Sequence, residues 1–209
     1  MTTLTDQVIH RELQRYGIAS TTEISSAIRA YIPLMLHWNR KISLTTITDP
    51  IEIVRFHFGE SMFSASLLAN KNGRLADVGS GAGFPGFPLK LVTPTLEVVL
   101  IESNAKKASF LAEVIRELNI GGAEVYRGSF EVFDGNGLGF DYITSRALGM
   151  HERIVDWSRG AVKLGGSLIL WLGESDAVQV AKKRSWEWRE PLLIPGSQRR
   201  MILAGAPSQ

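Results

Sequence analysis

Residues 75–90 read LADVGSGAGFPGFPLK, in which Asp77 closes an apolar run and four glycines follow between positions 79 and 86. Glycine loses more conformational entropy on folding than other residues. A cluster of glycines therefore indicates sharp backbone turns or a ligand held against bare main chain. In open α/β sheets, ligands bind beyond the carboxyl ends of the parallel strands. The stretch therefore predicts a strand, a ligand-binding loop and a helix.

The glycine spacing fits two kinds of ligand. Gly81, Gly83 and Gly86 match the G-x-G-x-x-G pattern of dinucleotide-binding loops, a weak signal on its own. Asp77 followed by Gly79, Gly81 and Gly83 matches the acid-led loop of enzymes that bind S-adenosyl-L-methionine (AdoMet). A tight turn without any ligand is the third alternative.

Asp77 and Pro85 favour AdoMet over a dinucleotide, and Glu102 is expected to bind the ribose of the ligand. Asp77 stands at the strand end, where dinucleotide enzymes usually have an apolar residue. Pro85 has no N–H to offer a pyrophosphate at the start of the following helix. Glu102 ends the next strand, where a carboxylate accepts hydrogen bonds from ribose hydroxyls. A solvated acid at a strand end is the alternative role for Glu102.

After residue 73, short β-rich runs alternate with helical runs. Strands are expected at 74–79, 96–102, 123–127, 140–145, 167–172, 186–194 and 199–204. Helices are expected between them at 84–92, 104–118, 150–163 and 174–184. The alternation predicts a Rossmann-like α/β fold with a mostly parallel, seven-stranded sheet covered on both faces. The short Pro-Gly-Ser link between the last two strands predicts an antiparallel hairpin.

The N-terminal part of the chain reads as helices. Apolar residues spaced three and four apart predict a helix over 22–42, and a kink is expected at Pro33 because proline removes a helical hydrogen bond. An Asp-Pro-Ile-Glu start predicts a second helix at 50–69. We therefore expect a helical extension over 1–72 and a sheet domain over 73–209.

Composition narrows the class of protein. The chain has 209 residues and no cysteine, which excludes disulfides and thiolate metal sites. It has neither a signal-peptide core nor an apolar stretch near the ~20 residues of a membrane span, so a cytoplasmic protein is expected. The net charge is only +2, but residues 182–209 carry six basic and two acidic side chains. This segment is either a basic patch or a solvated charged face.

Beyond the loop, the chain resembles the GidB/RsmG family of 16S rRNA guanine-N7 methyltransferases over nearly its whole length. The matching stretches are WNRKISLT (38–45), RFHFGES (55–61), DVGSGAGFPGFPLK (77–90), IESNAKKASFL (101–111), FDYITSRAL (140–148), the glycine pair 165–166 and QRRMIL (198–203). The resemblance implies a class I AdoMet methyltransferase fold. It also implies methyl transfer to N7 of a guanine in small-subunit rRNA or the 30S particle, by a protein that we expect to be a monomer without membrane or metal partners.

The resemblance and the loop together define the expected cofactor site. Its residues are Asp77, Gly79, Ser80, Gly81, Gly83, Phe84, Glu102, Gly128, Ser129 and Arg146. Guanine N7 carries a lone pair and no proton, so no general base is required and alignment is the main task. The four histidines lack metal-ligand spacing, and no metal is expected.

Arg146 is the expected catalytic residue, acting by positioning. It could bind the AdoMet carboxylate, an RNA phosphate or the guanine edge. A structural ion pair with a neighbouring acid such as Asp141 is the alternative.

The expected contacts to RNA are His57, Lys106, Lys107, Arg199 and Arg200. The four cations could instead be solvated surface charges. His57 could instead be a hydrogen-bonding residue in helix packing.

Four positions depart from the family pattern. Ser43 replaces an asparagine, Glu60 an aspartate, Ser129 an acid and Leu172 a lysine. Leu172 and Ser43 leave open a paralogue with another RNA or a small molecule as acceptor. A binding module without activity and an NAD-dependent oxidoreductase are two further alternatives, the latter disfavoured by Asp77 and Pro85.

Overall fold

The chain folds around one twisted sheet. The computed structural model describes residues 4–69, 71–146 and 149–208. The strands are β1 (Arg74–Val78), β2 (Glu97–Glu102), β3 (Ala123–Arg127), β4 (Phe140–Arg146), β5 (Val162–Gly173), β6 (Trp186–Trp188), β7 (Leu192–Leu193) and β8 (Arg200–Pro207). They lie in the order β3-β2-β1-β4-β5-β8-β6, with β7 also paired to β8. The first five strands are parallel, and β8 is antiparallel to β5, β6 and β7. This arrangement confirms the expected mostly parallel sheet with an antiparallel end.

The predicted strand at 186–194 is wrong in one respect, because it is divided into β6 and β7. The residues between the two parts are Arg189, Glu190 and Pro191. Arg189 still donates its N–H to the carbonyl of Ala204 on β8, at 2.8 Å. Pro191 has no N–H for the ladder, which explains why regular pairing stops there. In the described residues the sheet therefore has eight strands rather than seven.

Helices cover both faces of the sheet. They are α1 (Asp6–Gln14), α2 (Thr22–Asn39), α3 (Pro50–Ile53), α4 (Glu60–Phe63), α5 (Gly86–Val92), α6 (Ala105–Glu117), α7 (His151–Ala161) and α8 (Glu174–Val180). Val98 and Leu100 on β2 pack with α2, α5 and α6, whereas Val99 and Ile101 belong to the cluster that contains α7 and α8. The period of two along the strand thus separates the two layers of the core.

The predicted helix at 50–69 is one helical run with changing geometry. It begins at α3, where the Asp49 carboxylate accepts hydrogen bonds from the N–H groups of Ile51 and Glu52. It continues through a π-helical stretch η1 (Val54–Gly59), α4 and a 3₁₀ turn η2 (Ser64–Leu67). π-Helical turns are frequent at functional sites, and the residues of η1 and α4 carry much of the site described below.

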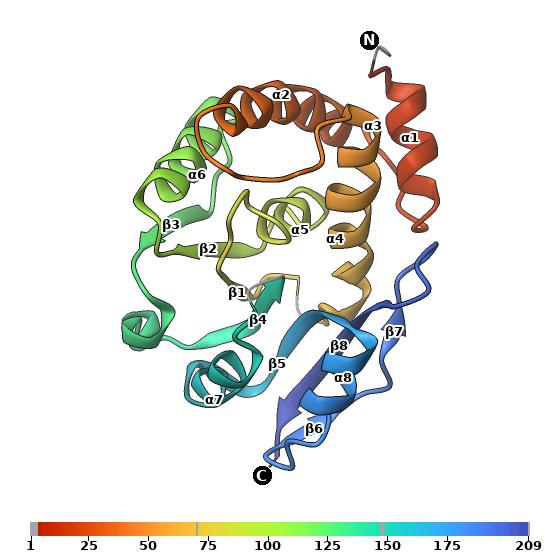
Figure 1. Cartoon of the computed structure of the whole chain (residues 1–209). Coiled ribbons are helices and arrows are strands. Elements are labelled where there is room, and N and C mark those ends of the chain that lie inside the picture. Colours follow the sequence, from red (N-terminus) through yellow and green to blue (C-terminus); the bar gives the residue numbers. More distant parts are fainter. Residues whose placement is uncertain (1–3, 70, 147–148, 209) are drawn as a thin grey trace.

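The N-terminal helices share their core with the sheet. Ile28 and Tyr31 of α2 lie in the same buried cluster as Leu75 of β1 and Phe87 of α5. Figure 1 shows α2, α3 and α4 arranged around α5, with the N-terminus beside α1 and the C-terminus beside β6. The separation into 1–72 and 73–209 stays a prediction, and apolar packing joins the two ranges. Within the described residues we find no helix long and apolar enough to cross a membrane.

Candidate active site

The glycine loop turns at the carboxyl end of β1. Gly79, Gly81 and Gly83 have φ angles of 70°, 57° and 83°, in the left-handed region that side chains disfavour. The N–H groups of Gly79 and Ser80 donate to the carbonyl of Ile101 on β2, at 2.9 and 3.2 Å. A side chain at Gly83 would also overlap the ring of Phe87. The glycines are therefore required by the turn and by close packing on α5.

The buried Asp77 side chain holds the backbone that follows this loop in place. Its carboxylate is fully buried and accepts hydrogen bonds from the Gly86 N–H at 3.1 Å and the Thr144 hydroxyl at 2.9 Å. Burial raises the pKa of Asp77 to about 6, against the effect of its hydrogen bonds with Thr144 and Gly86. The carboxylate points into the protein, so any contribution of Asp77 to ligand binding is through the shape of the loop.

Glu102 faces the opening of the loop. One carboxylate oxygen accepts from the Gly81 N–H at 2.9 Å, and the other accepts from the Asn104 N–H at 2.7 Å. The side chain is 7% exposed. An ionised carboxylate has about four lone-pair sites, so Glu102 can still accept hydrogen bonds from two hydroxyl groups.

A cavity of about 150 Å³ lies against this carboxylate. Its wall brings together four predicted residues, Gly79, Glu102, Gly128 and Ser129. The same wall contains Ile101, Ser103, Phe130, Glu131, Met150 and Arg153. The volume suits part of a nucleoside, so a whole cofactor would extend from it along the open side of the glycine loop.

Sequence reasoning missed two charged residues of this wall. Glu131 accepts a hydrogen bond from the Ser129 hydroxyl and forms an ion pair with Arg153 of α7. The sequence contained a signal for Glu131, because an acid was expected just after β3 and Ser129 stands there instead. The acid lies two residues later, in the short helix η3 (Phe130–Val132).

Phe84 and His57 close the other side of the loop. Their rings stack with centroids 4.8 Å apart and 26° between planes. Phe84 is 8% exposed and also packs against Tyr31 and Phe58. The Tyr31 hydroxyl donates to the carbonyl of Ala82, which fixes the loop to α2. Tyr31 carried no sequence signal beyond its place on an apolar helix face.

His57 is enclosed by the protein. Its Nε2 lies 2.8 Å from the Thr45 hydroxyl, and its buried Nδ1 has no hydrogen-bond partner among the described residues. Burial, and secondly the charge of Arg146, lower the pKa of His57 to about 3. The ring is therefore neutral near pH 7. These contacts support the packing role, and an RNA contact by His57 stays a prediction.

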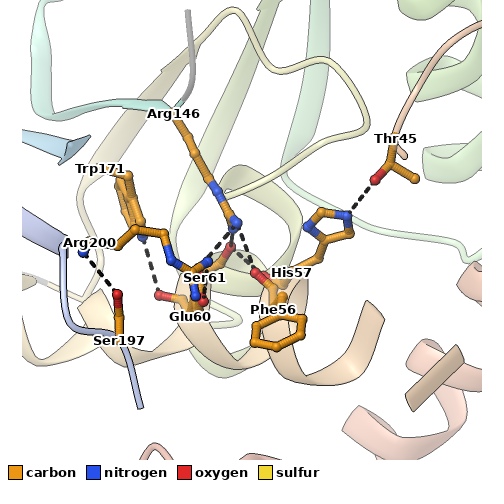
Figure 2. A network of polar contacts seen from close by, with 9 residues as sticks. All are labelled: Thr45, Phe56, His57, Glu60, Ser61, Arg146, Trp171, Ser197 and Arg200. Carbon is orange, nitrogen blue, oxygen red and sulfur yellow. Dashed lines mark hydrogen bonds and ion pairs between the residues drawn. The ribbon is translucent and has the colours of Figure 1, made fainter. Parts of the chain in front are cut away.

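Arg146 ends β4 in a network of polar contacts (Figure 2). Its guanidinium donates to the carbonyl of Phe56 at 2.8 Å, to the Ser61 hydroxyl at 3.3 Å and to Glu60 at 3.2 Å. The alternative of an ion pair with an acid is therefore met by Glu60, and Asp141, the example named for it, is wrong. Asp141 lies at the opposite end of β4, where it accepts from the side chain of Lys163 at 2.9 Å.

Glu60 is the centre of this network. Its side chain is 1% exposed, and its second oxygen lies 2.6 Å from Nη1 of Arg200. Its backbone carbonyl accepts from the Trp171 indole N–H at 3.3 Å. Burial raises the pKa of Glu60, and the two arginines oppose that shift.

The other predicted RNA contacts lie apart from this network. Lys106 and Lys107 lie in the first turn of α6, where the Asn104 side chain accepts from their backbone N–H groups. Lys106 and Arg199 are exposed, and Lys107 is half-buried. Of the five predicted contacts, the structure brings only His57 and Arg200 to the residues around Arg146.

A second, larger cavity of about 400 Å³ opens beside Arg146. It is lined by Glu60, Arg146, Gly149, His151, Trp171, Leu172, Gly173, Asp176, Ile194 and Arg200. It lies at the carboxyl ends of β4 and β5, the same edge of the sheet as the glycine loop. Leu172, where the family usually has lysine, contributes an apolar part of the wall. Ser43 is exposed and does not line this cavity. Among the described residues no group of three His, Asp or Glu is placed to hold a metal ion.

Comparison with known proteins gives consistent results. The model of the GidB family, described as rRNA small subunit methyltransferase G, matches residues 24–193. Ribosomal RNA small subunit methyltransferase G of Stenotrophomonas maltophilia strain K279a is 36% identical over 199 residues, which cover 91% of this chain and 92% of the relative.

Solved structures share the fold. The precorrin-6y C5,15-methyltransferase of Geobacter metallireducens superposes with a TM-score of 0.57 at 14% identity, covering 79% of this chain and 91% of that one. The structure of MtNAS in complex with MTA and tNA gives a TM-score of 0.63 at 17% identity, covering 85% of this chain and 71% of that one. The fold is that of the class I AdoMet methyltransferases.

Proposed function

Because this chain belongs to the GidB family of rRNA small subunit methyltransferases, we propose that it uses AdoMet to methylate N7 of a guanine in 16S rRNA. The observation that carries the proposal is the placement of two cavities at one edge of the sheet. One contains the glycine loop and Glu102, and the other contains Arg146 and Arg200. The substrate is small-subunit rRNA or the 30S particle, and the enzyme acts as a cytoplasmic monomer.

The residues at the loop suit AdoMet. The Glu102 carboxylate would hold the ribose hydroxyls, and Gly79 with Gly128 would allow close approach to bare main chain. Glu131 offers an acceptor for an amino group beside Ser129. When bound, AdoMet supplies a methyl group on a positively charged sulfur.

The acceptor side requires positioning rather than proton transfer. Guanine N7 has an in-plane lone pair and no proton, so transfer to it needs alignment with the methyl group and no general base. His57 stays neutral and is enclosed by Thr45 and Phe84. In this proposal Arg146 orients the acceptor nucleotide at the wall of the larger cavity.

The test is methylation of 30S subunits from cells that lack this gene, followed by mapping of the modified base. We expect a single N7-methylguanine in 16S rRNA that depends on AdoMet. Absence of that product, with AdoMet binding intact, would reject the proposed acceptor while leaving the family and the fold unaffected.

A second candidate, another RNA or a small molecule as acceptor, is favoured by Leu172 in the wall of the larger cavity. Filter binding to 16S rRNA separates an enzyme that acts on RNA from one that acts on a small molecule. An enzyme that acts on RNA loses affinity steeply with salt because Lys and Arg contacts to phosphates release counterions. An enzyme for a small molecule would show no such dependence above background.

A further inference from the structure

Glu60 links three neighbouring strands through one residue. Its carboxylate contacts Arg146 at the end of β4 and Arg200 at the start of β8, while its backbone carbonyl accepts from Trp171 on β5. In the sheet, Arg146 is in register with Trp171, and Arg200 is in register with Gly173. The two arginines therefore flank β5, and Glu60 holds them from α4 (Figure 2).

The cluster retains donors and positive charge. Two guanidiniums and one carboxylate give this cluster a net charge of +1, and the same cavity wall also contains the Asp176 carboxylate, 3.7 Å from His151. Glu60 and Arg146 are 1% and 16% exposed, but the Arg200 side chain is 46% exposed. A guanidinium has five N–H donors in a fixed plane, a geometry that matches phosphate oxygens. Arg200 can therefore keep its pair with Glu60 and still bind an anion in the cavity.

The position of Arg200 identifies the anion. Arg200 lies on β8, three strands from β1 and its glycine loop. At about 4.8 Å per strand this is roughly 14 Å across the sheet. The AdoMet carboxylate is an alternative anion for Arg146, but the remote arginine favours a group on the acceptor. An RNA acceptor carries one phosphate at each nucleotide.

We propose that Arg146 and Arg200 together bind a backbone phosphate of the acceptor nucleotide, and that Glu60 is the positioning residue that sets their geometry. This inference rests on the proposed function. Glu60 itself does not contact RNA. It holds the guanidinium groups of Arg146 and Arg200 at a fixed separation before the substrate binds. The two side chains then lose less conformational entropy on binding.

The variant E60Q tests the positioning role, because glutamine keeps the size of the side chain but not its charge. It makes the cavity more positive, so a purely electrostatic role would strengthen RNA binding and activity. We expect the opposite for activity, a fall in kcat/KM on 30S subunits of about 10- to 100-fold with AdoMet affinity unchanged within about twofold. The conservative variant E60D retains a carboxylate and should recover at least about tenfold over E60Q.

The matched control is E12Q. Glu12 is also 1% exposed and pairs with Arg11, Arg15 and Arg55, away from the cavity. E12Q should lose stability comparably to E60Q and keep kcat/KM within about twofold. Equal losses of activity in E60Q and E12Q would mean that Glu60 acts only through stability, which would overturn the proposal.

The variant R200A tests the phosphate contact without depending on a buried residue. We expect weaker binding to 16S rRNA and a decrease of about 0.7 in the slope of log affinity against log salt, as for one phosphate on a single strand. An unchanged slope would overturn the assignment. Weakened AdoMet binding with unchanged RNA binding would instead assign Arg146 and Arg200 to the carboxylate of the cofactor.

If the wild-type enzyme also fails to methylate 30S subunits, the proposed function fails. A loss of activity in the variants alone tests only this inference.

Discussion

At the scale of single residues, Glu102 is the side chain that we expect to contribute most to AdoMet binding. It shapes the loop through the Gly81 N–H and faces the smaller cavity. We expect E102A to weaken AdoMet binding about 10- to 100-fold, because a hydrogen bond to a charged group contributes about 1.5–3 kcal/mol. Isothermal titration calorimetry measures this directly.

The control for Glu102 lies on the same strand. Glu97 begins β2 at the opposite edge of the sheet and is exposed. E97A should bind AdoMet as the wild type does. Similar affinities for E102A and wild type would place the cofactor elsewhere.

His57 gives the residue-scale prediction for pH. Its pKa is about 3 in the folded protein, against about 6.5 in an unfolded chain. Between these values the unfolded state binds more protons, so stability rises with pH and is lost as the pH falls below 6.5. From pH 6.5 to 4.5 the loss from His57 is about 2 kcal/mol. In H57N this loss should be absent.

Urea denaturation at several pH values checks the difference between H57N and wild type. The comparison is necessary because Asp77 acts in the opposite direction. Burial raises its pKa to about 6, so its contribution to stability falls as the pH rises from about 4 to 6. Parallel pH profiles for H57N and wild type would show that His57 is protonated normally in the folded state.

At the scale of elements, the glycine loop combines backbone conformation with close packing. Gly83 has φ of 83° and lies against the Phe87 ring, whereas Gly17 has φ of 70° and nothing within 4 Å of the place that a Cβ would take. G17A should therefore cost only the left-handed strain of about 1–2 kcal/mol. G83A should cost clearly more, and should also weaken AdoMet binding.

Denaturant titrations of both variants separate the two effects. The difference between them measures the overlap with Phe87, since the backbone strain is common to both. If G83A is no less stable than G17A, α5 adapts to the extra methyl group and the close packing is not essential to the loop.

The sequence predicted elements well where a local signal exists. The β-rich run at 96–102 predicted a strand, and the side chains of β2 divide between the two cores. The helix expected at 104–118 is α6, which Asn104 caps by accepting from the Lys106 and Lys107 N–H groups. The π-helical stretch η1 had no such signal, because its geometry depends on tertiary contacts such as the one from Arg146 to Phe56.

At the scale of the whole molecule, the N-terminal helices stabilise the loop of the sheet domain. The contact is the hydrogen bond from Tyr31 to the Ala82 carbonyl, with the Tyr31 ring packed on Phe84. Y31F should lose about 1–2 kcal/mol of stability, because a buried carbonyl is left without its donor. AdoMet binding should weaken severalfold with it, as measured by calorimetry.

Tyr16 provides the comparison for Tyr31. It is also buried, and its ring packs against Phe63 rather than against the glycine loop. Y16F should keep both stability and AdoMet affinity. Equal behaviour of the two variants would mean that the bond to Ala82 contributes nothing to the loop.

Long-range pairing marks the limit of prediction from sequence. Residues such as Gly79, Glu102 and Arg146 follow strand ends, and their common edge can be inferred from the parallel order. The pair between Arg146 and Glu60 joins positions 86 residues apart, and nothing local distinguishes Glu60 from the nearer Asp141. Buried ion pairs depend on how helices cross the sheet, which a single sequence does not specify.

The short helical run from η1 to α4 connects the glycine loop with the larger cavity. His57 stacks on Phe84 of the glycine loop, and Glu60, three residues later, contacts Arg146 and Arg200 in the wall of the larger cavity. A shift of this helical turn when AdoMet binds at the glycine loop would therefore also move the arginines of the larger cavity. The affinities for AdoMet and for RNA should then be linked. Bound RNA should increase the affinity for AdoMet by the same factor as bound AdoMet increases the affinity for RNA.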